Sequence, residues 1–362
     1  MKPAGIKEEK ELSEQVFVKR LLAWNQKENK RQMPWKGEKD PYKIWLSEII
    51  LQQTRVEQGL KYYENFIRTF PNIQALATAP EEKVFKLWEG LGYYSRCRNL
   101  IATAKHIYSD LDGKFPSQYS AILQLKGIGP YTAAAIASFA YNMPYAVVDG
   151  NVFRVLSRIC DIETPIDSTQ GKKEFNQLAQ GLLPSKRAGE YNQAIMDFGA
   201  MICKPVPECN ACFINDHCKG FRAGKQQLLP VKGKRINIRE RWLNYIVVQH
   251  KTEVAIHQRN EKDIWQKLFE FCLIETSEKC NPQQVLQLFE KQYGIMDYKV
   301  LSTREESVQK LTHQLIHFRF LTIALPRKQP IPHCTWMSMK NLREITFPQS
   351  LRTFVDSCLP GL

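Results

Sequence analysis

The sequence predicts a multidomain protein in which an all-α part is followed by a smaller α/β part. Residues 12–220 are typical of successive helices, separated by Gly- and Pro-containing turns such as "FPNIQ", "KFPSQ" and "NMPYA". From Trp242 onward, the β-branched and aromatic runs "WLNYIVVQH", "EVAIHQR", "LFEFCLIE" and "HQLIHFRFLTIAL" predict strands. The basic segment "KGKRINIRER" lies between the two parts. We therefore expect a helical domain over 1–225, a linker over 226–241 and an α/β domain over 242–362.

Charge and hydropathy limit the classes of function. The 362 residues carry a net charge of +14 with a pI near 9.2, which indicates an acidic partner such as nucleic acid. No run of 18 apolar residues exists, so no membrane span is expected. The first fifteen residues mix both charges and lack the apolar segment of a secretory signal.

The first helical segment to carry a chemical signal is "WLSEIILQQT", residues 45–54. Asp40 and Pro41 predict its N-cap and first turn, and the helix that follows is apolar almost all round, which is typical of a buried helix. Glu48 therefore lies among apolar side chains. A buried, unpaired carboxylate is costly and tends to hold a proton. The alternatives are that Glu48 pairs with an arginine or that it lies at the rim of the helix.

The stretch "LKGIGPYTA", residues 125–133, predicts a tight hairpin between two helices. Gly127 and Gly129 can adopt backbone angles closed to other residues and let the backbone approach a partner closely. The amides of the following helix can then bind a phosphate, and Lys126 faces the same backbone. The pattern resembles the helix-hairpin-helix motif of sequence-tolerant DNA binding, although a Gly-x-Gly turn also occurs without that role.

One helix length later, "VVDGNVFRV" places Asp149 where a new helix begins. An aspartate there is an N-cap, and helix-terminal amides keep such a carboxylate ionised. Glu48 and Asp149 would then have opposite environments, one protonated and one ionised. That arrangement suits cleavage of a glycosidic bond, with an acid for the leaving group and an anion facing the oxocarbenium ion.

The ten cysteines do not suggest a disulfide framework, because six are scattered and four fall within "CKPVPECNACFINDHC". This compact group is typical of a metal site in a reducing compartment. Four thiolates at this spacing suit a tetrahedral zinc or a [4Fe–4S] cluster, and spacing alone does not decide between them. The candidate ligands are Cys203, Cys209, Cys212 and Cys218.

Together these motifs resemble the endonuclease III superfamily of DNA glycosylases, and within it the adenine DNA glycosylase (MutY) branch. The resemblance also includes "RQMPW" (31–35), "GLGYYSRCRNL" (90–100) and "YNQAIMDFGAMIC" (191–203). It implies a six-helix barrel that carries the hairpin, a helical lobe that holds a [4Fe–4S] cluster at 203–218, and a C-terminal Nudix-like domain that recognises 8-oxoguanine. A monomer in a bacterial cytoplasm, associated with the nucleoid, is expected; the basic linker also matches a weak nuclear signal.

The resemblance implies base-excision repair, by hydrolysis of the N-glycosidic bond of adenine mispaired with 8-oxoguanine or guanine in double-stranded DNA. Glu48 would protonate the adenine at N7 and then activate water, and Asp149 would stabilise the cationic sugar. Tyr131 and Asn151 would support them. The remaining implied contacts are to the flipped adenine, by Arg31 and Trp35, and to the duplex that it leaves, by Gln53, Thr54, Leu91 and Tyr93. Extruding a base costs a few kcal/mol of stacking and pairing. Side chains that fill the gap and bond the orphaned partner base offset part of that cost.

Position 131 separates related activities. Members of the superfamily that also nick the strand carry a lysine there, whereas this chain has Tyr131 and places no amine for a Schiff base. A monofunctional glycosylase is therefore expected. The alternatives are a thymine-mismatch or oxidised-pyrimidine glycosylase on the same scaffold, and a non-catalytic iron–sulfur protein that scans DNA.

Three departures from the family pattern concern single segments. Lys126 replaces a usual proline, and the first cysteine interval has five residues where six are usual. In the C-terminal domain, Leu311, Thr312 and His313 stand where the family has a Phe-Ser-His-like loop that probes the oxidised guanine; the other interpretation is an ordinary surface loop. The Nudix hydrolase signature is missing, so no pyrophosphatase activity is expected.

Overall fold

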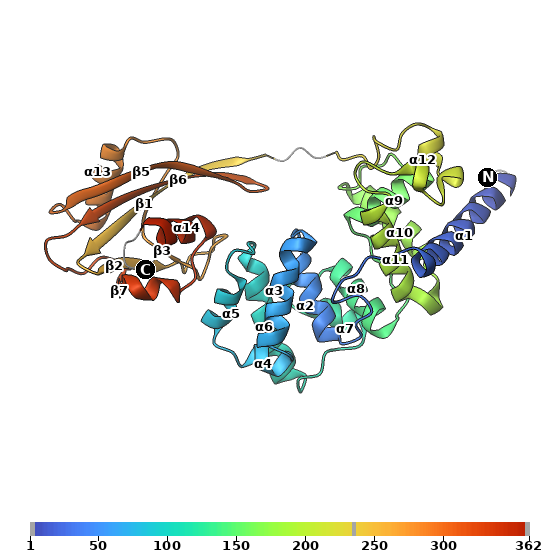
Figure 1. The fold of residues 1–362 in the computed structure, drawn as a ribbon, viewed down its shortest axis with the longest axis horizontal. Coiled ribbons are helices and arrows are strands. Elements are labelled where there is room, and N and C mark those ends of the chain that lie inside the picture. Colours follow the sequence, from blue (N-terminus) through green and yellow to red (C-terminus); the bar gives the residue numbers. More distant parts are fainter. Residues whose placement is uncertain (1–3, 234–236, 359–362) are drawn as a thin grey trace. The chain divides into compact units, whose positions relative to one another are not determined.

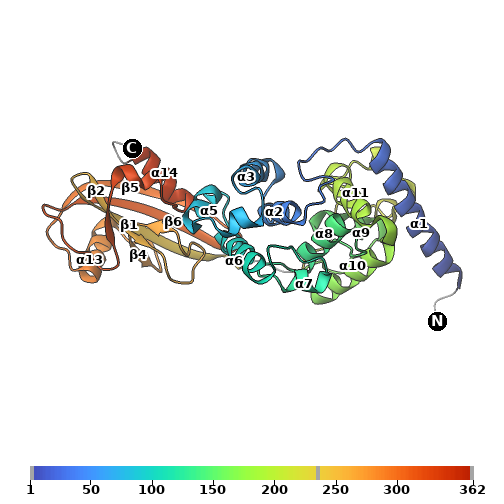
Figure 2. The ribbon, with the colours of Figure 1, turned by 90° about the horizontal axis from the view of Figure 1, so that it is seen from below.

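The computed structural model describes residues 4–233 and 237–358, which form two compact units (Figures 1 and 2). One unit comprises Met1–Thr78 and Asn99–Lys234, and the other comprises Ala79–Arg98 and Arg235–Leu362. The first is helical and the second is built on a sheet, which confirms the predicted fold class. Of the described helices, none is long and apolar enough to span a bilayer.

The helical unit consists of α-helices and three short 3-10 turns. Its helices are α1 (Ala4–Lys27), α2 (Pro41–Leu51), α3 (Val56–Thr69), α4 (Ile73–Ala77), α6 (Tyr94–Asp110), α7 (Tyr119–Gln124), α8 (Pro130–Tyr141), α9 (Gly150–Cys160), α10 (Thr169–Leu182), α11 (Ala188–Met201) and α12 (Lys219–Arg222); the turns are η1 (Ser185–Arg187), η2 (Cys209–Ala211) and η3 (Asn215–His217). Two groups of helices form in it. The helices α2, α3, α7 and α8 contact one another, and α1, α9, α10 and α11 enclose a core around Phe175, Tyr191 and Phe198.

The local sequence explains where the site-bearing helices begin and end. Asp40 caps α2 by accepting a hydrogen bond from the backbone N–H of Tyr42, with Pro41 at the first position, as predicted. α8 ends at Asn142, which has a left-handed conformation and directs the chain away from the helix. α2 and α8 are apolar on nearly every face because they are buried against each other.

The second unit is a seven-stranded mixed sheet with the main order β3-β2-β1-β6-β5. Its strands are β1 (Arg239–His250), β2 (Glu253–Gln258), β3 (Phe269–Glu270), β4 (Cys272–Thr276), β5 (Lys299–Lys310), β6 (Gln314–Ala324) and β7 (Thr335–Ser338). β1 and β6 run parallel, with Leu243 opposite Phe318, and the other pairs are antiparallel. Most residues in the middle of β1 and β6 are buried. Because successive residues of a strand point to opposite faces, apolar side chains lie on both faces of this central pair.

Two helices cover the two faces of the sheet. α13 (Pro282–Tyr293), with Asn281 in a capping box and Gly294 in the left-handed region, packs against Ile246 and Leu321. α14 (Gln349–Cys358) packs on the other face, where the ring of Phe354 stacks on Phe320 with centroids 4.2 Å apart. Figure 2 shows the sheet between these helices. η4 (Met339–Arg343) precedes α14.

Residues 79–98, which the sequence assigned to the helical domain, group with the sheet by their contacts. The segment contains α5 (Glu81–Trp88) and the first turn of α6. Glu89 accepts a hydrogen bond from the backbone N–H of Phe347 at 2.9 Å and pairs with Arg352 at 3.0 Å. Arg98 donates to the carbonyl of Gln266 at 3.0 Å. These contacts join residues distant in sequence, which is why composition did not indicate them.

The expected linker, 226–241, is shorter in the structure, because β1 already begins at Arg239. Arg241 is not a solvated basic residue: it is 7% exposed and bonds the carboxylate of Glu275 through two hydrogen bonds of 2.8 Å. Part of the linker, residues 234–236, lies outside the described residues. β5 was not predicted because "KVLSTREESVQK" is polar, as suits a strand at the edge of a sheet.

Candidate active site

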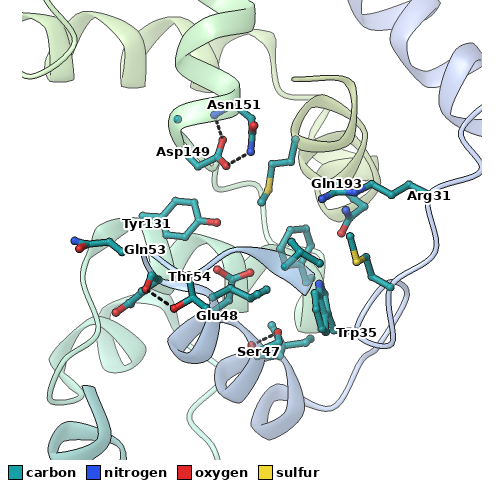
Figure 3. Close-up of a pocket in the computed structure, with 18 residues that line it drawn as sticks. Arg31, Trp35, Ser47, Glu48, Gln53, Thr54, Tyr131, Asp149, Asn151 and Gln193 are labelled. Carbon is teal, nitrogen blue, oxygen red and sulfur yellow. Dashed lines mark hydrogen bonds between the residues drawn. The ribbon is translucent and has the colours of Figure 1, made fainter. Parts of the chain in front are cut away.

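A cavity of about 360 Å³ lies in the helical unit and contains most of the predicted site residues of that unit (Figure 3). Its walls come from α2, from the hairpin helix α8, from the start of α9 and from α11. The lining residues include Arg31, Met33, Trp35, Ser47, Glu48, Gln52, Gln53, Thr54, Tyr131, Phe139, Asp149, Asn151, Gln193 and Met196. Segments separated by more than a hundred residues thus meet around one space.

Glu48 projects from the buried helix α2 into this cavity and is 9% exposed. Burial raises its pKa from 4.5 to about 7, contact with the Tyr131 hydroxyl lowers it, and the charge of Asp149 raises it. Neither of these neighbours is a cation, so the alternative of a glutamate paired with an arginine does not describe this site. Arg31 lines the same cavity but bonds Asp197. Glu48 is therefore mostly protonated below pH 7 and about half protonated near pH 7.

Asp149 is the N-cap of α9 and faces the same cavity from the opposite side to Glu48 (Figure 3). Its Oδ1 accepts from the backbone N–H groups of Asn151 and Val152 at 2.9 and 2.8 Å, and its Oδ2 accepts from Asn151 Nδ2 at 2.6 Å. The sequence argument considered only these donors. In the structure burial is the largest effect and raises the pKa of Asp149, while the donors lower it. All three partners are donors and bind the ionised form best.

The hairpin between α7 and α8 brings Tyr131 to the cavity. Gly127 has φ +79°, and a Cβ there would lie 2.7 Å from the side chain of Asn99, so only glycine fits. Gly129 differs from the expectation, because its φ of −95° is open to any residue and nothing lies within 4 Å of a Cβ built on it. Lys126 is exposed beside them.

A buried carboxylate that the sequence analysis missed organises one wall of the cavity. Asp197, on α11, is fully buried and accepts from Arg31 Nη1 at 2.8 Å, Gln193 Nε2 at 3.0 Å and Asn29 Nδ2 at 2.8 Å, and it pairs with Lys36 Nζ at 2.9 Å. Arg31 and Gln193 are thereby fixed where they line the cavity. The i, i+4 spacing of Gln193 and Asp197 within "YNQAIMDFGAMIC" was the available signal.

The residues expected to enter the duplex differ in their conformations. Gln53 and Thr54 line the cavity just after α2, and Gln53 has φ +56°. Tyr93 also has a left-handed conformation, with φ +46°, and its side chain is 45% exposed. Leu91 does not match the expectation of a projecting wedge, because it is only 5% exposed. Its backbone N–H donates to the carbonyl of Trp88 at 3.0 Å.

Within the sheet unit, the predicted guanine-probing loop meets the segment that carries Tyr93. The Tyr93 hydroxyl lies 3.0 Å from the Thr312 hydroxyl, and the Arg96 guanidinium lies over the Tyr93 ring at 5.4 Å. Thr312 and His313 are exposed, and Leu311 is half-buried. The backbone N–H of Arg239 holds the His313 carbonyl at 3.0 Å. Two segments that the sequence proposed separately therefore form one surface.

The four clustered cysteines converge on a second, apolar cavity beside α9 and α12. Burial is the largest cause that raises the pKa of all four thiols, and the charge of Cys203 also raises the pKa of the other three. Arg158 donates to Cys203 Sγ at 3.4 Å. Within the described ranges, no three His, Cys, Asp or Glu side chains lie close enough to hold a single ion. Four cysteine thiols that line one apolar cavity are a donor set of the kind that a metal–sulfur cluster uses.

Comparison with known proteins places this geometry in a family. Residues 46–184 match the model of the HhH-GPD superfamily base excision DNA repair proteins, and residues 244–357 match the NUDIX domain model. An adenine DNA glycosylase of Buchnera aphidicola subsp. Baizongia pistaciae is 35% identical over 315 residues, covering 86% of each chain. This chain belongs to the adenine DNA glycosylase family. The human adenine DNA glycosylase is 39% identical over 228 residues, covering 60% of this chain and 42% of the human protein.

Two solved structures resemble part of this glycosylase family member, each over somewhat more than half of the chain. A thermostable thymine-DNA glycosylase superposes with a TM-score of 0.55 at 29% identity, covering 59% of this chain and 99% of the other. An endonuclease III solved in a non-covalent complex with DNA gives a TM-score of 0.50 at 18% identity, covering 58% of this chain and 97% of the other, which shows the shared fold.

Proposed function

We propose that this chain removes adenine from duplex DNA by hydrolysing its N-glycosidic bond, when the adenine is paired with 8-oxoguanine or guanine. The observation that supports this most is the pair of carboxyl groups in one cavity, Glu48 and Asp149. Glu48 has a pKa near 7 and no cation among the groups that shift it, whereas Asp149 is surrounded by donors. Membership of the adenine DNA glycosylase family identifies the base.

Glu48 supplies the proton in this mechanism. Adenine is a poor leaving group as an anion, so protonation of its ring at N7 lowers the barrier to breaking the C1′–N9 bond. A group with a pKa near the working pH is the best general acid. Once the base has left, the Glu48 carboxylate takes a proton from the attacking water. Tyr131, beside Glu48, holds the carboxyl group in position.

Asp149 provides the negative charge opposite the developing sugar cation. Its three hydrogen-bond donors fix both carboxylate oxygens and favour the anion. Asn151, whose side chain also accepts from Arg154 at 2.6 Å, is itself held in place. The anion stabilises the oxocarbenium ion either by its charge or by a transient bond to C1′.

The reaction stops at the abasic site. Among the described residues that line the cavity, none is a lysine, and Tyr131 stands at the position from which an amine would attack. Without an amine no Schiff base forms, so no strand nicking follows. Robust borohydride trapping of the chain on nicked product would contradict this.

The partner base is read by the surface around Tyr93, Thr312 and His313. The Tyr93 ring, exposed and in a left-handed conformation, is available to stack beside the orphaned base. The hydroxyl of Thr312 and the ring nitrogens of His313 can donate to the extra oxygen of 8-oxoguanine and accept from its N7–H. Leu91, being buried, supports this segment from behind rather than entering the duplex.

Cys203, Cys209, Cys212 and Cys218 hold a [4Fe–4S] cluster in this proposal. When bound, it would tie together the segment between α11 and α12, which carries all four thiols, beside α9. An absorption band in the visible region and about four irons per chain are expected. A colourless protein that contains zinc would contradict the assignment.

Single-turnover excision on four duplexes tests the function. Adenine opposite 8-oxoguanine and adenine opposite guanine should be processed, and adenine opposite thymine should not. The fourth duplex, thymine opposite guanine, tests the activity in the name of the structurally similar thymine-DNA glycosylase. Thymine release faster than adenine release would replace the proposal by that activity.

A further inference from the structure

Two thiols in the sheet unit lie in contact, outside any site described above. Cys272 on β4 and Cys334, just before β7, have their Sγ atoms 3.6 Å apart. Cys272 is 1% exposed, whereas Cys334 is half-buried and follows the exposed His333. We propose that Cys334 and Cys272 form a peroxide-sensitive dithiol, with Cys334 as the residue that reacts first and Cys272 as the residue that completes a disulfide.

The surroundings of the pair favour a reactive Cys334. His257 lies nearby on β2 and bonds Glu270 at 3.3 Å, which raises the pKa of the imidazole and favours its cationic form. A hydrogen bond from the Cys272 thiol lowers the pKa of Cys334, and the charge of His257 lowers it further, against the effect of burial. The pKa of Cys272 is raised well above its usual range. The thiolate is the nucleophilic form of cysteine, so the more accessible thiol is also the more reactive.

The geometry permits the bond between the two sulfurs. The two sulfurs already lie 3.6 Å apart, and a disulfide requires about 2.05 Å. β4 is held by β1, with Cys272 opposite Ile246, and Thr335, next to Cys334, is held opposite Ile256 of β2. The two cysteines therefore start from positions that the sheet has already fixed.

The chemistry balances with hydrogen peroxide as the oxidant. The Cys334 thiolate attacks the O–O bond and becomes a sulfenic acid, and hydroxide leaves and takes up a proton to give water. The Cys272 thiol then attacks the sulfenic sulfur, the S–S bond forms, and a second water leaves. The thiols lose two electrons and two protons, and one peroxide is reduced to two waters.

The full-length protein, with its cysteine-bound group intact, is treated with hydrogen peroxide in the presence of a chelator, blocked with an alkylating reagent and mapped by peptide mass spectrometry. We expect a Cys272–Cys334 cross-linked peptide that dithiothreitol removes. The cross-link should form on the order of tenfold faster than Cys280 is oxidised. Cys280 is the reference because it is another half-buried cysteine of the sheet unit. The disulfide closes a loop spanning 62 residues and should raise the unfolding temperature of the sheet unit.

Three variants test the order of the two steps. In Cys272→Ser the sulfenic acid should persist on Cys334 and be captured by dimedone, whereas Cys334→Ser should leave Cys272 unmodified. Cys280→Ser is the matched control and should retain the cross-link. Oxidation of Cys280 at the same rate, absence of the cross-link in the wild type, or dimedone on Cys272 in Cys334→Ser would each overturn the proposal. The peptide map of the wild-type protein can refute the proposal by itself, so the test does not depend on every variant folding.

Discussion

Two buried glutamates, one in each unit, have opposite surroundings. Glu48 is 9% exposed in the helical unit, and the neighbours that shift its pKa are a hydroxyl and another carboxylate. Glu270 is 4% exposed in the sheet unit, where it pairs with Arg259, bonds His257 at 3.3 Å and accepts from the Tyr245 hydroxyl at 3.1 Å. Burial is nearly the same, but one charge is compensated and the other is not.

The difference teaches how burial of a carboxyl group should be interpreted. A buried carboxylate with a cation keeps its charge and ties elements together, since removing one partner leaves the other uncompensated. A buried carboxyl group without a cation keeps its proton to a higher pH, so it can transfer that proton near neutral pH. The comparison predicts that one substitution, Glu to Gln, has opposite consequences at the two positions.

The largest expected effect is on catalysis at Glu48. Glu48→Gln keeps the shape of the side chain but has no proton to donate, so the single-turnover excision rate should fall by about 10²–10⁴-fold. Affinity for the duplex should change little, because phosphate contacts dominate it. Glu270→Gln is the control and should retain excision at temperatures where it remains folded. Normal excision by Glu48→Gln would show that another group is the acid.

The second effect is on the stability of the sheet unit. Glu270→Gln removes the more deeply buried of the two carboxylates that pair with Arg259, which keeps only Asp263, and should lower the free energy of unfolding by about 3 kcal/mol. Denaturant titration followed by circular dichroism measures it. Glu48→Gln should not destabilise the helical unit at neutral pH. An equal loss of unfolding free energy in both variants would show that the two glutamates do not differ in this way.

The third effect is the pH dependence of stability from Glu48. Its pKa is about 7 in the folded state and 4.5 when unperturbed, so the unfolded state releases the proton first as pH rises. Wild-type stability from this group is therefore complete below pH 4.5 and is lost as pH rises through 7, by about 3 kcal/mol in total. Relative to wild type, Glu48→Gln should gain stability between pH 5 and pH 8. A constant difference across that range would mean that Glu48 is already ionised.

The smallest effect concerns the contact between Tyr93 and Thr312. Tyr93→Phe and Thr312→Val each remove one hydroxyl of the 3.0 Å pair, and the side chains are exposed. Their coupling in a double-mutant cycle should be about 1 kcal/mol. The readout is the ratio of excision rates for adenine opposite 8-oxoguanine and opposite guanine. Strictly additive changes would show that the two hydroxyls act separately.

Local signals account for the parts of the site that were predicted. Asp40 and Pro41 mark the start of α2, the φ of Gly127 requires glycine, and Asp149 is an N-cap. These features depend on residues a few positions apart, so they are visible in the sequence. The role of Asp197 and the association of residues 79–98 with the sheet depend on partners distant in sequence.

The sequence by itself determined that the first part is helical and the second α/β, that a buried helix carries Glu48, and that Asp149 caps a helix. Periodicity and capping act within one or two turns of chain, so they are visible in the sequence. Only the tertiary structure decided that these carboxyl groups face one cavity, that Arg31 is committed to Asp197, and that Cys272 touches Cys334. The physical reason is that a charge or a thiol acquires its chemistry from whatever surrounds it. In a folded chain those surroundings come from segments that the local pattern does not connect.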